Sequence, residues 1–506
     1  MTKALMIQGT SSHAGKSVLA AAFGRWLLEQ RLRVAPFKAQ NMSLNSFVTL
    51  QGEEIARSQA MQAEALGLEP TADMNPILLK PMDPGCQVIV RGKPAGVMSI
   101  QEYYAFQAQA WRGITESYRR LATEYDAIVL EGAGSPVEIN LRDHDLVNMR
   151  MADHADAVVL LVADIERGGV FAQLIGTWEL LAREERARVA GFMINKFRGD
   201  SSLLDSGLEY VQKRTSRPVL GVLPYDPAVQ LDEEDSLGLQ QSELSSAEIE
   251  VAVLRLPGIS NFTDFAALAR VPHLAVRYVS EPEQLYSPDL LILPGTRTTL
   301  RALTWMKANG WLESIRQLSA QNGGPLILGL CGGMQLLGRS IEDPEGVESS
   351  PGRTEGLGLL EIDTRFGPTK MLYRVEGEVI SSGTWGLGCS VIGYEVHQGV
   401  SRGREGTSAW LRLRRHPGDE IVEDGAISAD GRVAGTYIHG LFDDARFCRA
   451  LVDLLRRRRG LAPLQEPAWL GQREYWTHRY RQLGGWLREH CDLRPVSEAM
   501  GLKLQS

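Results

Sequence analysis

The chain has 506 residues, a formal net charge of −8 at neutral pH and 44% hydrophobic residues. A single core rarely extends beyond about 250–300 residues, so this length predicts two or more domains. The negative charge argues against a nucleic-acid partner. No apolar run approaches the ~18 residues of a membrane span, and no leader pattern opens the chain, so we expect a cytoplasmic protein. The five cysteines have no C-x-x-C spacing, which predicts reduced thiols and no metal cluster.

The first motif is a phosphate-binding loop, G-T-S-S-H-A-G-K-S, which follows a short apolar strand pattern and precedes a helical one. Backbone N–H groups of such a loop, here including those of Thr10 and Gly15, surround phosphate oxygens. Lys16 is expected to reach the β and γ phosphates, and Ser17 to ligate Mg²⁺. Thr10 replaces the first glycine of the usual pattern. This stretch predicts an ATP site.

Three further strand patterns end in polar residues near this loop. Lys38 follows the second strand and is a candidate to bind phosphate or a carboxylate substrate, with a solvated loop as the alternative. Glu131 ends a buried strand, and Mg²⁺ on a phosphate loop needs an acid from a neighbouring strand end. Asn195 and Lys196 follow another strand and resemble the base-reading corner of phosphate-loop proteins, so we expect them near adenine.

Strand patterns alternate with helix-length segments along both halves of the chain. This alternation predicts an α/β fold with two doubly wound domains, the first built on a parallel sheet. We place the first domain at residues 1–225, an acidic linker at 226–249 and the second domain at 250–445. Residues 446–506 are rich in leucine, arginine and tryptophan, which predicts C-terminal helices packed on the second domain.

Cys331 lies between an apolar strand pattern and a helical one, beside Gly332 and Gly333. Small neighbours permit a strained turn, and a helix N-terminus favours the thiolate, so this stretch predicts a nucleophile; a buried core cysteine is the alternative. Gly295, in a Pro-Gly turn, and Gly332 are candidate backbone donors to an oxyanion. His439 ends a later strand and is the candidate proton carrier, with a structural histidine as the alternative.

These three stretches resemble the glutaminase domain of class I (triad) glutamine amidotransferases, which has a flavodoxin-like fold. The resemblance implies that Cys331 attacks the glutamine amide, that His439 protonates the departing ammonia, and that water hydrolyses the thioester. Many members carry a glutamate two residues after the histidine, where this chain has Leu441. The third triad member is therefore not assigned. His397 is a candidate for the glutamine pocket or for a structural role.

The phosphate loop, the E-G-A-G strand end and the N-K turn resemble dethiobiotin-synthetase-like ATPases, which phosphorylate a carboxylate. Together with a glutaminase, such a domain would make an amide. The motifs, among them N-P from Asn75, L-K-P from Leu79 and the run Ile259 to Asp264, stand in the same order as in the cobyric acid synthase family, which the chain resembles. The specific part of this resemblance is K-A-Q-N-M-S from Lys38. That resemblance implies use of MgATP and glutamine to amidate the b, d, e and g carboxylates of a corrinoid, adenosylcobyrinic acid a,c-diamide, in cobalamin biosynthesis.

Two alternatives remain open from the sequence. The nearer is cobyrinic acid a,c-diamide synthase or another cofactor amidotransferase with the same two domains. The more distant is a nucleotide switch of the partitioning ATPase class with an inactive glutaminase domain. Thr10 stands where that class commonly has a lysine, and both Cys331 and His439 are present, which argues against it. The sequence does not predict the oligomeric state, the order of amidation or the residues that contact the corrin.

Overall fold

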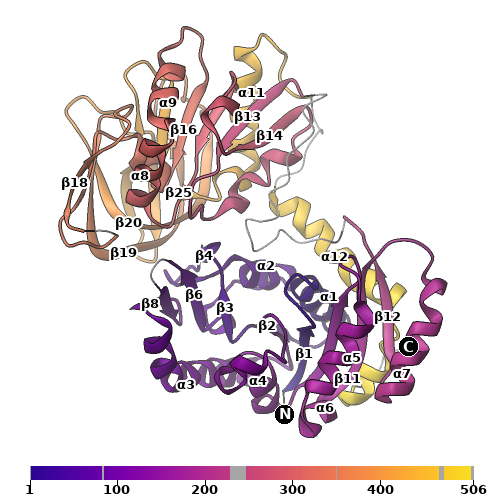
Figure 1. Ribbon diagram of the computed structural model, residues 1–506. Helices are drawn as coiled ribbons and strands as arrows, with labels where there is room; N and C mark the ends of the chain where they lie inside the picture. The colour runs from indigo at the N-terminus through magenta and orange to yellow at the C-terminus, as the bar shows by residue number, and fades with distance from the viewer. Residues whose placement is uncertain are drawn as a thin grey trace. The chain divides into compact units, whose positions relative to one another are not determined.

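The computed structural model describes residues 2–82, 85–227, 229, 247–348, 350–465 and 472–502. The chain forms two compact units (Figure 1). The first unit comprises Met1–Ser43, Ile55–Asp232 and Trp476–Ser506, and the second comprises Leu44–Glu54 and Glu233–Tyr475. The chain therefore passes between the units four times. Most of the predicted linker, 226–249, lies outside the described residues.

The first unit is built on a parallel sheet of six strands in the order β12-β11-β10-β1-β9-β2. Their bounds are β1 Lys3–Gly9, β2 Val34–Phe37, β9 Ala127–Glu131, β10 Val158–Asp164, β11 Val189–Phe197 and β12 Val219–Pro224. The central strands are buried on both faces, which explains their continuous apolar runs. In this register Glu131 lies opposite Ile7, and Asn195 opposite Asp164, so polar residues meet at one edge. The predicted parallel-sheet domain is confirmed.

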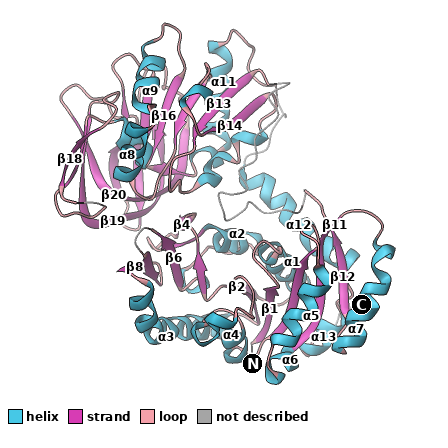
Figure 2. Ribbon diagram, viewed as in Figure 1, coloured by secondary structure: helices cyan, strands magenta, loops and turns pink. Residues whose placement is uncertain are grey.

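Helices pack around these strands (Figure 2). They are α1 Lys16–Glu29, α2 Arg57–Ala65, α3 Ile100–Glu124, α4 Met149–His154, α5 Val170–Leu180, α6 Arg183–Arg188, α7 Asp205–Thr215, α12 Gln472–His490 and α13 Arg494–Ala499. A second sheet of this unit has the order β3-β6-β7-β8, with bounds Gln40–Met42, Ile77–Pro81, Cys86–Val90 and Lys93–Met98. Helix α1 packs on β1, β2 and β9, and this contact places the phosphate loop at the polar edge of the six-stranded sheet.

The C-terminal helices are divided between the two units. Helix α11, Ala445–Arg458, belongs to the second unit, whereas α12 from Trp476 onward and α13 belong to the first. The backbone N–H of Asp492 donates to the carbonyl of Leu220 at 2.8 Å. Cys491 forms an isolated antiparallel backbone pair with Gly221 of the edge strand β12. The prediction that 446–506 packs on the second domain is therefore wrong for these two helices. An apolar helical pattern shows that one face is buried, without showing against which partner.

The second unit has a six-stranded sheet in the order β14-β13-β15-β16-β24-β23, in which only the short β23 is antiparallel. Bounds are β13 Ile249–Leu254, β14 Leu274–Val279, β15 Leu290–Leu293, β16 Leu326–Leu330, β23 Ala426–Ile427 and β24 Val433–Thr436. Helices α8 Thr299–Ala308, α9 Trp311–Ala320 and α10 Gly332–Leu337 accompany α11. This sheet confirms the second α/β domain.

A second, largely antiparallel sheet completes this unit, with β18-β17-β19-β20-β25 in order and β21 and β22 beside β19. Bounds are β17 Ser340–Asp343, β18 Gly352–Glu355, β19 Ile362–Val379, β20 Ser390–Gly403, β21 Leu411–His416, β22 Glu420–Asp424 and β25 Ile438–His439. The short helical turn η6, Phe262–Phe265, follows β13. Strands β4, Ser46–Val48, and β5, Glu54–Ala56, form a separate pair. None of the described helices combines the length and hydropathy needed to cross a membrane.

Candidate active site

The phosphate loop of the first unit folds around its own lysine. Lys16 donates from its ammonium group to the carbonyl of Ser11 at 2.9 Å and to that of Gly134 at 3.3 Å. The hydroxyl of Thr10 donates to Gln173 on α5 at 3.1 Å. The loop is thus held between β1, β9 and α5, with a buried cation at its centre. That arrangement suits a polyphosphate.

Asn195 and Lys196 lie at the same edge of the sheet. Asn195 donates from its side-chain amide to the carbonyl of Ala14 at 3.0 Å, and this bond holds the backbone of the phosphate loop in place. Gly15 has φ 94°, and a Cβ there would lie 2.0 Å from the Asn195 amide nitrogen, so this position requires glycine. The ammonium of Lys196 pairs with Asp164 at 3.0 Å.

Glu131 brings together three side chains from separate elements. Its Oε1 accepts from the hydroxyl of Ser17 at 3.0 Å and from the ammonium of Lys38 at 2.8 Å, and its Oε2 accepts from the amide of Gln62 at 2.5 Å. The predicted residues Ser17, Lys38 and Glu131 therefore meet in one cluster, in which Lys38 and Glu131 are buried and Ser17 is half-buried. Gln62, on α2, was not predicted from the sequence, because a polar residue in a helix carries no motif, and the burial of the polar residues of α2 appears only in the structure.

Ser17 and Glu131 offer oxygen ligands that suit Mg²⁺. Their oxygens are 3.0 Å apart, on the side of the loop where α1 begins. Mg²⁺ is usually held by one or two protein oxygens together with substrate phosphates and water. Among the described residues, no group of three or more His, Cys, Asp or Glu side chains is arranged to hold a metal ion. The cluster therefore fits a magnesium ion that arrives with a nucleotide.

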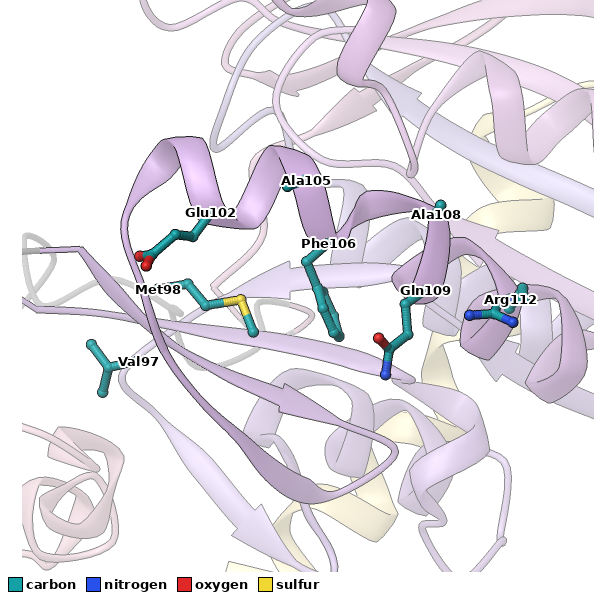
Figure 3. Close-up of a pocket in the computed structure, with 8 residues that line it drawn as sticks. All are labelled: Val97, Met98, Glu102, Ala105, Phe106, Ala108, Gln109 and Arg112. Atoms are coloured by element: carbon teal, nitrogen blue, oxygen red, sulfur yellow. The ribbon is translucent and has the colours of Figure 1, made fainter.

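A separate pocket of about 530 Å³ lies between β8 and α3 of the first unit (Figure 3). Met98, Phe106 and Gln109 face it, and Glu102 and Arg112 lie toward its two ends. None of its lining residues comes from the phosphate loop or from the Glu131 cluster. The pocket is thus distinct from the phosphate-binding edge.

Cys331 of the second unit occupies a strained turn between β16 and α10. Its φ is 51° and its ψ is −112°, outside the conformations that a residue with a side chain adopts easily. The turn is tight because α10 approaches β15 closely: a Cβ at Gly333 would lie 1.8 Å from the Leu293 carbonyl oxygen. The thiol lies 3.8 Å from the Val396 carbonyl oxygen. Cys331 thus stands at a tight strand-to-helix turn, and its role as a nucleophile stays a prediction.

His439 is buried and held by an aspartate. Its Nδ1 lies 2.7 Å from Oδ2 of Asp264 in η6, and Oδ1 of the same carboxylate accepts the backbone N–H of Gly440 at 2.9 Å. Burial alone would lower the pKa of His439, but the charge of Asp264 and the neighbouring Cys331 outweigh it and raise the pKa to about 10. Cys331, His439 and Asp264 thus form a buried triad.

Asp264 is the partner that the sequence left unassigned. It precedes His439 by 175 residues and comes from a different element. Leu441, at the position where a glutamate was sought, is fully buried in the apolar core. The available signal was the Ile259 to Asp264 run, which ends on this residue.

The two predicted oxyanion glycines lie beside the triad. A Cβ at Gly295 would be 2.8 Å from Cε1 of His439, and a Cβ at Gly332 would be 3.2 Å from the backbone nitrogen of Thr296. His397 is stacked on Tyr437, and Nδ1 lies 3.0 Å from the Gly399 carbonyl oxygen. Burial lowers the pKa of His397 to about 3, so its ring is neutral at working pH.

Comparison with known proteins covers nearly the whole chain. The family model of the CobQ/CobB/MinD/ParA nucleotide binding domain matches residues 5–238, and that of the CobB/CobQ-like glutamine amidotransferase domain matches residues 250–447. A cobyric acid synthase of Pelotomaculum thermopropionicum is 47% identical over 99% of this chain and 97% of its own. One from Yersinia enterocolitica is 46% identical over 99% of this chain and 98% of its own. The chain belongs to the cobyric acid synthase family.

Membership in this family confirms the resemblance drawn from the motifs. It also agrees with the two clusters described above: a nucleotide-binding domain carries the Glu131 cluster, and a glutamine amidotransferase domain carries the Cys331 triad. The chain is therefore an ATP-dependent glutamine amidotransferase.

Proposed function

We propose that the protein amidates the b, d, e and g side-chain carboxylates of adenosylcobyrinic acid a,c-diamide, with glutamine as the nitrogen donor and MgATP as the activating substrate. The observation that carries this proposal is the pairing, in one family member, of the Lys38–Glu131 cluster with the Cys331–His439–Asp264 triad. One cluster is suited to activating a carboxylate, and the other to releasing ammonia. The corrinoid substrate itself is inferred from the relatives' activity.

In the glutaminase reaction, the thiolate of Cys331 attacks the side-chain carbonyl carbon of glutamine. Backbone N–H groups at Gly295 and Gly332 stabilise the oxyanion, and the imidazolium of His439 protonates the departing ammonia. Asp264 holds His439 in the tautomer that carries a proton on Nδ1, which leaves Nε2 to exchange protons with the thiol. Water then attacks the thioester, His439 accepts its proton, and glutamate leaves.

In the synthetase reaction, a substrate carboxylate attacks the γ-phosphorus of ATP, ADP leaves, and an acyl phosphate forms. Ammonia then attacks the acyl carbon and phosphate departs. Lys16 and Lys38 neutralise charge on the phosphates and the carboxylate, while the backbone of Thr10 and Gly15 orients the phosphates. We expect Asn195 and Lys196, which lie at the same edge of the sheet as the phosphate loop, to be near the nucleotide base. Mg²⁺, held by Ser17 and Glu131, would neutralise the charge that develops on the phosphate oxygens.

Mass spectrometry of the corrinoid tests this function. Adenosylcobyrinic acid a,c-diamide is incubated with MgATP and either glutamine or ammonium, in parallel with cobyrinic acid. We expect stepwise addition of amide groups to the diamide with both nitrogen sources. Cys331→Ala should lose the glutamine-driven reaction and keep the ammonium-driven one, because the thiol acts only on glutamine. Conversion of cobyrinic acid alone would indicate a,c-diamide synthase, and ATP hydrolysis without corrinoid amidation would refute the proposal.

A further inference from the structure

Residues 44–54 lie within the stretch matched by the nucleotide-binding family model but pack in the second unit. This segment, called here the 44–54 excursion, contains β4 and the turn that leads into β5. The turn is closed by two backbone bonds, from Thr49 to Glu53 at 2.9 Å and from Gly52 to Thr49 at 3.0 Å. The excursion is thus an ordered hairpin with defined contacts.

The first contact joins the hairpin to Asn261, the residue before η6. The backbone N–H of Ser46 donates to Oδ1 of Asn261 at 3.3 Å, and Nδ2 of Asn261 donates to the Ser46 carbonyl at 3.1 Å. The same Nδ2 also donates to the hydroxyl of Tyr394 at 2.9 Å. All three groups are buried, so each bond would be costly to break.

Three further contacts fix the hairpin against β19 and β20. Phe47 is buried with its ring centroid 5.2 Å from that of Tyr394, and the guanidinium of Arg374 lies 4.8 Å above the Phe47 ring. Glu54 and Lys370 form an ion pair at 2.5 Å, with both side chains at least nine-tenths buried. A buried pair of this kind requires a fixed partner geometry.

The groups that receive these contacts also hold the catalytic histidine. The ring of Tyr394 is stacked on that of His439, with centroids 5.7 Å apart and an interplanar angle of 25°. Asn261 begins the turn that ends near Asp264, and its carbonyl accepts the backbone N–H of Asp264 at 3.0 Å. The hairpin therefore touches both supports of His439, the stacked ring on one side and the carboxylate-bearing turn on the other.

Both ends of the excursion are anchored in the first unit. The N–H of Ser43 donates to the Leu79 carbonyl at 3.1 Å, and that of Ala56 donates to the Asn75 side chain at 3.0 Å. Asn75 also donates to the carbonyl of Lys38 at 3.1 Å. The 44–54 excursion, which supports His439, is thus continuous in the chain with the stretch that carries Lys38.

We propose that the 44–54 excursion is a positioning element of the glutaminase site, through which Phe47 and Ser46 keep His439 in register with Cys331. The excursion acts through Tyr394 and Asn261, which set the ring plane and the position of the carboxylate. The catalytic use of this alignment rests on the proposed function.

The test compares Phe47→Ala, Phe47→Leu and Gln51→Ala with the wild type in the full-length enzyme. Gln51 is exposed at the tip of the same hairpin and serves as the matched control. Glutamate release measures the glutaminase, and ammonium-driven amidation measures the synthetase. We expect Phe47→Ala to lower kcat for glutamine hydrolysis by about 10- to 100-fold, because a small misplacement of a catalytic group has an effect of this size.

The expected change is confined to kcat for glutamine hydrolysis. KM for glutamine and the ammonium-driven rate should stay within about twofold of wild type, because the ring of Phe47 packs on Tyr394 and is expected to act on the position of His439. Phe47→Leu should be intermediate, and Gln51→Ala unchanged. Unchanged glutaminase in Phe47→Ala would overturn the inference while leaving the proposed function intact. If Phe47→Ala loses both activities, Phe47→Leu decides: a selective glutaminase loss supports positioning, and an equal loss of both overturns it. A wild type that releases no glutamate overturns both proposals.

Discussion

Replacing Asp264 by asparagine should disable the glutaminase while leaving the synthetase active. The carboxylate accepts two N–H groups, Nδ1 of His439 and the backbone of Gly440. A carboxamide has one oxygen and one NH₂ group, so it cannot accept both. If its oxygen serves Gly440, the NH₂ group faces Nδ1 and selects the tautomer protonated on Nε2. That tautomer cannot accept a proton from Cys331.

The expected fall in kcat for Asp264→Asn follows from the burial of the His439–Asp264 pair. The side chains of His439 and Asp264 are 1% and 4% exposed, so water does not replace the lost interaction. Removing one partner of such a buried pair costs about 3–5 kcal/mol. With 1.36 kcal/mol for each factor of ten in rate, kcat for glutamine hydrolysis should fall by about 10²- to 10⁴-fold.

The assay is glutamate release under saturating glutamine, with ammonium-driven amidation as the internal control. Glu405→Gln, which neutralises an exposed carboxylate of the same unit, is the matched variant and should behave as wild type. An Asp264→Asn enzyme that hydrolyses glutamine within about threefold of wild type would refute the triad assignment, because such a ratio corresponds to less than about 1 kcal/mol.

Three other predictions follow from particular contacts. Glu131→Gln should abolish amidation with either nitrogen source and leave glutamate release within about twofold, because it removes the negative charge that pairs with Lys38 and replaces one of the two acceptor oxygens by an NH₂ group, and both changes lie in the first unit. Gly333→Ala should lower the free energy of unfolding by about 3 kcal/mol in urea titrations, since its Cβ would overlap a carbonyl oxygen, whereas Gly367→Ala, with open space, should not. The raised pKa of His439 contributes stability that is full below pH 6.5 and is lost toward pH 10. The difference in free energy of unfolding between wild type and Asp264→Asn should therefore decrease as pH rises through that range. A difference that increases with pH would contradict a raised pKa of His439.

The sequence predicted the parts of both sites that depend on local pattern. The phosphate loop, Glu131 at a strand end and Cys331 before a glycine pair each need a particular residue at a particular turn, and such needs are visible in one short stretch. Parallel strands then bring their ends to one edge, so the meeting of Lys38, Ser17 and Glu131 could be inferred from topology.

The contacts that were missed depend on packing between distant segments. Asp264 holds His439 from a turn far upstream, and no spacing rule links the two. Gln62 reaches Glu131 from a helix whose polar face reads equally well as solvent-exposed. Helices α12 and α13 have an apolar face, and the sequence does not show which domain that face packs on. Phe47 is an ordinary apolar residue in the sequence, and only the structure shows its contact with Tyr394.

The fourfold passage of the chain between its units bears on how the gene can be divided. Cutting at the 226–249 linker would produce a second fragment that lacks Phe47 and Glu54, and a first fragment that lacks α12 and α13. The first fragment would expose the surface that α12 and α13 cover, and the second fragment would expose the surface that residues 44–54 cover. Neither fragment would be a complete unit. A two-subunit version of this protein would have to exchange these segments in trans, in the manner of a domain-swapped pair. Because segments of the two units alternate along the chain, the fold favours a single polypeptide that both produces and uses ammonia.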